Sequence, residues 1–85
     1  MNYTYIIECE DGTYYTGYTN DLEKRFAAHK AGEGARYTRA HKPKKIVYYE
    51  EFEDKKDALS REWHIKHMRR SDKQKLIESF IEKKK

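Results

Sequence analysis

The stretch from Tyr3 to Gly17 constrains the fold more than any other, because two runs of β-favouring residues meet there at an Asp-Gly pair. The first run alternates: Tyr, Tyr, Ile and Cys at residues 3, 5, 7 and 9 share one side, and Thr, Ile and Glu at residues 4, 6 and 8 share the other. The second run is equally rich in aromatic and β-branched side chains. This pattern predicts an antiparallel hairpin.

The register of this hairpin decides which tyrosines face each other. A two-residue loop would place Tyr5 and Tyr15 on opposite faces. A three-residue loop, with Gly12 in the left-handed position of a β-bulge, pairs Ile7 with Tyr15 and Tyr5 with Gly17. We favour the second register, because Gly12 then stands where a positive φ is needed and Gly17 opens space beside Tyr5.

Length and charge limit the class of protein. The chain has 85 residues, which predicts one domain over residues 1–82 and a frayed basic tail at 83–85. A single cysteine, Cys9, and no apolar segment resembling a signal peptide or a membrane span lead us to expect a cytoplasmic protein. The net charge of +4 arises from 19 basic and 15 acidic residues, so it is only weak support for a nucleic-acid partner.

After the hairpin, the sequence predicts a helix from about Asp21 to Ala31, with Asn20 as N-cap and Glu23 completing a capping box. Residues 33–45 contain the only proline and many cations, which predicts a basic loop. Residues 46–52 have high β propensity and predict a third strand that returns beside the hairpin.

Two more helices are predicted towards the C-terminus. The first is capped by Asp54 and runs over about 55–68, with an apolar stripe formed by Ala58, Leu59, Trp63 and Ile65. The second begins at a capping box of Ser71 and Gln74. The expected fold is therefore α+β, a small three-stranded antiparallel sheet packed by three helices in the order β-β-α-β-α-α.

Five residues stand out as candidates for chemistry, although each has an ordinary structural explanation. Tyr5 and Tyr15 can be packing residues of a strand, and Arg25 and His29 can form a solvated helix edge. Glu62 can pair with a neighbouring lysine, but it falls inside the stripe that should face the sheet. Taken together, these side chains can converge on one cleft.

The same residues resemble the GIY-YIG nuclease family over nearly the whole chain. Tyr3-Thr4-Tyr5 and Tyr15-Thr16-Gly17 stand where the two tripeptides of the family would be, and Arg25, His29 and Glu62 match its helical residues. Tyr3 replaces the first Gly of the pattern and Thr16 replaces the Ile. The chain looks most like the stand-alone bacterial branch, which carries a segment like Gly34-Ala35-Arg36-Tyr37-Thr38-Arg39.

This resemblance implies a GIY-YIG-type endonuclease that hydrolyses phosphodiester bonds of DNA, with a role such as DNA repair. It implies that Glu62 holds one Mg²⁺ or Mn²⁺ ion, that Arg25 clamps the phosphate, and that one of Tyr5 and Tyr15 is the general base. We favour Tyr15 as the base. His29 is then expected to take the proton of the base or to orient its phenol.

The basic loop would supply a grip on DNA that is non-specific or selective for structure. The residues expected to bind nucleic acid are Arg36, Tyr37, Arg39, Lys42, Lys44 and Lys45. A catalytically weak or inactive nucleic-acid-binding module on the same scaffold is the main alternative, and a protein-interaction module is a third reading. A protein partner or self-association stays open.

Overall fold

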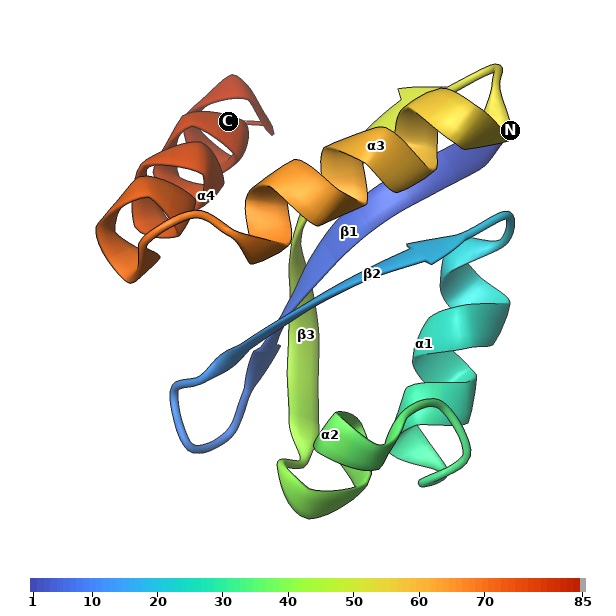
Figure 1. Cartoon of the computed structure of the whole chain (residues 1–85). Coiled ribbons are helices and arrows are strands. Elements are labelled where there is room, and N and C mark those ends of the chain that lie inside the picture. Colours follow the sequence, from blue (N-terminus) through green and yellow to red (C-terminus); the bar gives the residue numbers. More distant parts are fainter. Residues whose placement is uncertain (85) are drawn as a thin grey trace.

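A computed structural model describes residues 1–84 of the chain, and Lys85 lies outside the described residues. The strands are β1 (Asn2–Cys9), β2 (Tyr14–Thr19) and β3 (Pro43–Phe52), and the helices are α1 (Leu22–Lys30), α2 (Arg36–Ala40), α3 (Lys55–Lys66) and α4 (Arg70–Lys84). The three strands form one antiparallel sheet in the order β2-β1-β3, so the predicted α+β fold is confirmed (Figure 1). Fraying of residues 83–85 stays a prediction.

The hairpin has the predicted register. Ile7 pairs with Tyr15 and Tyr5 pairs with Gly17. Gly12 has a φ of +85°, and its N–H donates to the Cys9 carbonyl at 3.0 Å to close the turn. Tyr5 and Tyr15 therefore point to the same face of the sheet.

Both faces of the sheet are covered by helices, with α1 and α2 on one side and α3 and α4 on the other (Figure 1). On the first side, Tyr5 and Ile7 are buried against partly buried residues of α1 and α2. On the second side, Ile6 and Val47 pack with Ile65 of α3 and with α4. Successive side chains of β1 thus point alternately into two thin cores, one on each face of the sheet.

The starts of two helices differ from the predictions. The N-cap of α1 is Asp21, whose side chain accepts from the Lys24 N–H at 3.1 Å, so the predicted capping box at Asn20 is wrong by one residue. The reason is that the Thr19 hydroxyl accepts the Asp21 N–H and so holds the turn one residue further along. The predicted N-cap of α3, Asp54, is confirmed.

Helix α4 begins at Arg70, one residue before Ser71, so the predicted capping box of Ser71 and Gln74 is wrong. The Arg69 carbonyl accepts from the N–H groups of residues 72 and 73, which fixes the first turn earlier in the chain. Ser71 therefore lies inside the first turn of α4.

The predicted apolar stripe of α3 is only half right. Ala58 and Ile65 are fully buried against the sheet, whereas Leu59 is 41% exposed and Trp63 is 59% exposed. The two exposed residues lie a quarter turn or more from the line through Ala58 and Ile65, because each residue advances by about 100° around a helix. The stripe that contacts the sheet is therefore narrower than the sequence suggests.

The basic segment 33–45 is not the irregular loop that was predicted. It contains the short helix α2, and β3 already begins at Pro43. Thr38 of α2 is buried, and Tyr37 packs against the sheet face that carries Tyr5. These inward contacts order a segment whose composition alone indicates a solvated loop. Within residues 1–84, no helix is long and apolar enough to span a bilayer.

Candidate active site

Tyr5 lies on the central strand and is only 2% exposed. Its hydroxyl extends over Gly17 of the neighbouring strand β2. A Cβ atom at residue 17 would come within 2.5 Å of that hydroxyl oxygen. Glycine is therefore required at this position if the Tyr5 hydroxyl is to reach the edge of the sheet.

A chain of hydrogen bonds runs from Tyr5 through His29 to Thr38. The Tyr5 hydroxyl lies 2.8 Å from His29 Nε2, and His29 Nδ1 lies 2.6 Å from Thr38 Oγ1. Thr38 Oγ1 donates its single proton to the Ala35 carbonyl at 3.2 Å, so it must accept from His29 Nδ1. A neutral His29 therefore carries its proton on Nδ1, and Nε2 accepts the Tyr5 hydroxyl.

His29 sits in the last turn of α1 and is fully buried. Burial, and to a smaller extent the nearby Arg25 guanidinium, lowers its pKa to about 4. His29 is therefore neutral at pH 7 in the free protein, which agrees with the tautomer deduced from its hydrogen bonds.

Tyr15 stands beside the same imidazole. Its ring centroid is 5.2 Å from that of His29 and 6.4 Å from that of Tyr5. Tyr37 stacks on Tyr15 at 5.9 Å, and His41 stacks on Tyr37 at 4.3 Å. The α2 segment thus covers Tyr15 with a column of aromatic rings.

Arg25 lies one turn before His29 on α1 and is half-buried. Its Nη2 donates to the Gly34 carbonyl at 3.0 Å, while its buried Nε has no hydrogen-bond partner among the described residues. Arg25 also lines a hollow of about 230 Å³ together with Lys24 and Asp21, so two cations and one carboxylate border it. A guanidinium that lines an open hollow can bind an anion such as a phosphate.

Glu62 lies on the flank of α3 nearest β2. The preceding residue, Arg61, points the other way, because its Nε contacts Glu50 of β3 at 2.7 Å. One residue later, about 100° around the helix, Glu62 falls on the opposite flank. There its carboxylate pairs with Lys66 at 3.2 Å.

The pKa of Tyr5 shows that these groups share one electrostatic environment. This pKa is raised to about 12, chiefly by burial and also by the neighbouring Tyr15 and Glu62, while the interaction with Arg25 opposes the rise. Tyr5, Tyr15 and His29 therefore contact one another, and Arg25 and Glu62 lie near enough to influence the Tyr5 hydroxyl. The chemical roles predicted for the five residues stay predictions.

The donors near Glu62 fit a hard divalent cation bound mainly through water. Within residues 1–84, no group of three or more His, Cys, Asp or Glu side chains is placed to hold a metal, so a single carboxylate would be the main ligand. A single carboxylate suits Mg²⁺, which binds oxygen ligands and keeps several of its waters.

The residues predicted to bind nucleic acid are spread over α2 and the start of β3. Arg36, Arg39, Lys42, Lys44 and Lys45 are exposed. Arg39 Nε also donates to the Gly32 carbonyl at 3.2 Å. Tyr37 is half-buried between the rings of Tyr15 and His41, so its ring is already stacked within the protein.

Sequence reasoning missed two features of this region. Thr38 fixes the protonation of His29, yet nothing in a short basic segment marks one threonine as buried. Lys66, Arg70 and Lys73 form a cationic cluster: burial lowers the pKa of Lys73, and the charges of Arg70 and Lys66 lower it further. The spacing of these three residues in the sequence gives little indication that they lie together, because the chain bends between α3 and α4.

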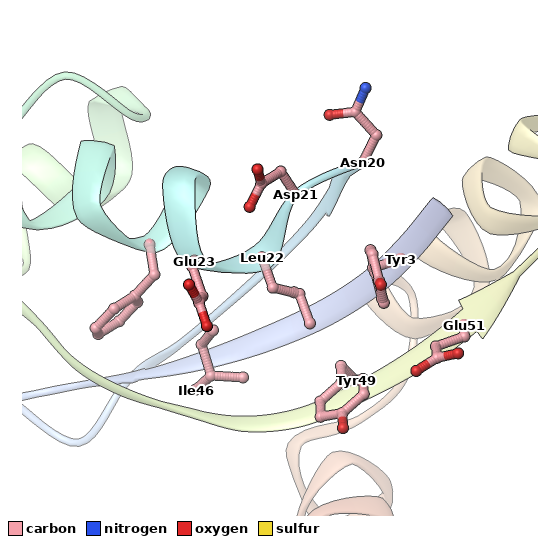
Figure 2. A pocket seen from close by; sticks show the side chains of 9 residues that line it. Tyr3, Asn20, Asp21, Leu22, Glu23, Ile46, Tyr49 and Glu51 are labelled. Atoms are coloured by element: carbon pink, nitrogen blue, oxygen red, sulfur yellow. The ribbon is translucent and has the colours of Figure 1, made fainter. Parts of the chain in front are cut away.

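A separate hollow of about 550 Å³ lies between α1 and the strands β1 and β3. Figure 2 shows Leu22 pointing from α1 towards the sheet, with Tyr49 and Glu51 on β3. Its rim carries the carboxylates of Asp21, Glu23 and Glu51. These carboxylates would repel phosphates, and Tyr5, His29 and Glu62 are not among the residues that line it.

Comparison with known proteins places the chain in one family. The family model described as the GIY-YIG catalytic domain matches residues 1–76. The chain therefore belongs to the GIY-YIG family, which is a family of nucleases.

Relatives of similar length support this placement. A UPF0213 protein of Clostridium perfringens is 54% identical over 79 residues, covering 93% of this chain and 85% of that protein. A UPF0213 protein of Halobacterium salinarum is 49% identical, covering 91% of this chain and 100% of that protein. The solution NMR structure of a UPF0213 protein from Bacillus halodurans is 43% identical, with a TM-score of 0.59, and the match covers 92% of this chain and 84% of that one. None of these names states a substrate.

Proposed function

We propose that this protein is a metal-dependent endonuclease that hydrolyses phosphodiester bonds of DNA, using one divalent ion and a tyrosine general base. The observation that carries the proposal is the buried hydrogen-bond chain from Tyr5 through His29 to Thr38, placed beside Arg25 and Glu62. A tyrosine that only packs in a core does not need a neutral imidazole held in one tautomer. A tyrosine that must pass on a proton needs such an acceptor beside its hydroxyl.

The hydrogen-bond chain supports Tyr5 as the base, rather than the Tyr15 favoured from the sequence. Tyr5 would accept a proton from the attacking water and give its own proton to His29 Nε2. Thr38 would keep that nitrogen free to accept it. Tyr15 packs against the imidazole and would restrict its movement and its access to water.

The pKa values indicate when this transfer can occur. The pKa of Tyr5 is near 12 and that of His29 is near 4. Moving the proton from Tyr5 to His29 in the free protein is therefore uphill by on the order of 10 kcal/mol. A bound phosphate would raise the pKa of His29, because it draws Arg25 to itself and its negative charge favours a cationic imidazole. The same two changes disfavour a phenolate at Tyr5, so Tyr5 must give up its own proton as it takes the proton of the water. The transfer is therefore expected only when substrate is bound.

Glu62 would hold the metal ion. When bound, Mg²⁺ or Mn²⁺ supplies positive charge that stabilises the oxygen leaving the phosphorus. Lys66 must release Glu62 for this to happen. Arg25 would clamp the phosphate through its guanidinium, which borders an open hollow together with Lys24.

A nucleic-acid-binding module without turnover is the second candidate. The contact between Lys66 and Glu62 favours it, because a lysine ammonium already neutralises the carboxylate that would hold the metal. Salt-sensitive binding through the exposed cations of α2 and β3 would then be the whole function.

Cleavage of labelled single-stranded, duplex and branched DNA by the wild type, Glu62→Gln and Tyr5→Phe tests the proposal, with Mg²⁺, Mn²⁺ or a chelator. We expect metal-dependent cutting that falls by at least about 100-fold in both variants while DNA binding persists. Glu50→Gln is the matched control, since Glu50 also pairs with a cation of α3 but on the far flank. Cutting by Glu62→Gln at the wild-type rate, or no cutting by any form, would reject the nuclease.

A further inference from the structure

The flank of α3 that carries Glu62 also exposes two large apolar side chains. Leu59 and Trp63 are 41% and 59% exposed. Successive residues advance by about 100°, so these two side chains and Lys66 lie on the same flank as Glu62, further from the sheet. An exposed tryptophan next to a candidate catalytic carboxylate is an unusual use of the largest aromatic ring in the chain.

The Trp63 ring is held in place rather than left to move. The imidazole of His67 stacks on it with centroids 4.1 Å apart and planes inclined by 27°. His67 Nδ1 in turn lies 2.7 Å from the Trp63 carbonyl, which fixes the imidazole on the same turn of the helix. A ring that is supported by a neighbour and still more than half exposed is a suitable stacking platform.

Cations follow this platform along the chain, with Lys66 one turn after Trp63 on α3 and Arg70 and Lys73 at the start of α4. The pKa of Lys73 is lowered chiefly by burial and also by the charges of Arg70 and Lys66, which agrees with their closeness to one another. Arg70 is fixed by donating to the Gly12 carbonyl at 2.6 Å and by its position over the Tyr14 ring at 4.5 Å. An exposed aromatic ring followed along the chain by three cations is complementary to the bases and the backbone of a polynucleotide.

We propose that this flank binds single-stranded DNA, with an unpaired base stacked on Trp63 and the adjoining phosphates contacting Lys66, Arg70 and Lys73. A base offers its face to a protein ring only when it is unpaired, so the platform favours single strands over duplexes. Contact between a phosphate and Lys66 would also draw that ammonium away from Glu62. The link to cleavage rests on the proposed nuclease function, whereas the binding surface does not.

Trp63 is the single tryptophan of the chain, so intrinsic fluorescence reports this surface alone. The protein, in chelator to prevent cleavage, is titrated with a thymidine oligonucleotide of about ten nucleotides and with a duplex of equal length. We expect quenching and tighter binding with the single strand. Trp63→Ala should weaken single-strand binding roughly 5- to 150-fold, and Trp63→Phe should recover most of it.

Ile81→Ala is the matched control, because Ile81 is 43% exposed but lies on α4. Affinity unchanged in Trp63→Ala, or equal quenching by duplex, overturns the inference even if metal-dependent cleavage stands. Quenching by a matched ribonucleotide strand but not by thymidines also overturns it. Quenching by the single strand in a protein that never cleaves DNA keeps the surface and rejects only the nuclease.

Discussion

Replacing Thr38 by Val tests the assignment of protons in the buried hydrogen-bond chain. Valine keeps the shape of the side chain but removes the hydroxyl that accepts from His29 Nδ1 at 2.6 Å. His29 then has two options: it leaves a buried N–H without a partner, or it moves its proton to Nε2 and no longer accepts from Tyr5. Either option disfavours the acceptor form of His29 by about 1–3 kcal/mol. If the transfer from Tyr5 to His29 limits catalysis, cleavage falls roughly 5- to 150-fold.

Two-dimensional ¹⁵N NMR of the histidine rings measures this directly, because protonated and unprotonated ring nitrogens have well-separated shifts. We expect protonated Nδ1 and unprotonated Nε2 in the wild type and in Thr38→Ser, and a loss of that pattern in Thr38→Val. Thr4→Val is the matched control, since Thr4 is equally buried and its hydroxyl donates to the Ala58 carbonyl at 2.6 Å. If Thr38→Val keeps the wild-type protonation of the His29 ring and the wild-type rate of cleavage, the reasoning is refuted.

Three further predictions follow from burial and close contacts. Gly17→Ala should place a methyl group against the Tyr5 hydroxyl and reduce cleavage more than it reduces the melting temperature, as assays of both would show. His29 has a folded pKa near 4 and an ordinary value of 6.5, so its contribution to stability is complete above pH 6.5. Up to about 3 kcal/mol of this contribution should be lost as the pH falls from 6.5 to 4. Urea unfolding should therefore show a free energy of unfolding that falls over this pH range in the wild type but not in His29→Gln. Ile6→Ala should lower the free energy of unfolding by about 2–5 kcal/mol, because Ile6 is fully buried between the sheet and α3, and a loss below 1 kcal/mol would contradict that packing.

The sequence predicted the parts of the fold that depend on local rules. Gly12 in the turn set the hairpin register, and the register placed Tyr5 and Tyr15 on one face. A spacing of four residues brought Arg25 and His29 to the same side of α1. These relations need only the geometry of one element or of two neighbouring strands.

What the sequence did not predict depends on contacts between distant elements. Thr38 is buried because α2 folds back over α1, and nothing in its neighbourhood separates it from a solvated threonine. Trp63 was assigned to the core because it is apolar, yet a chain with two thin cores has little space left for it. The capping error at Asn20 was of another kind, since Asp21 is an equally good cap and only the Thr19 contact decides between them.

The placement of charge along the sheet gives DNA a preferred side of approach. At the end of the sheet formed by the hairpin turn, the Glu10 N–H contacts the Lys42 carbonyl, and Arg70 contacts the Gly12 carbonyl. The cations of α2 and β3 and Arg70 of α4 therefore approach one turn, which itself carries Glu10 and an Asp11 that is paired with His41. The acidic hollow belongs to the other end, where Tyr3 of β1 pairs with Thr19 and Glu51. A net charge of +4 would not orient a polynucleotide, but this separation of charge would bring it to the edge of the sheet where Tyr5 and Glu62 lie.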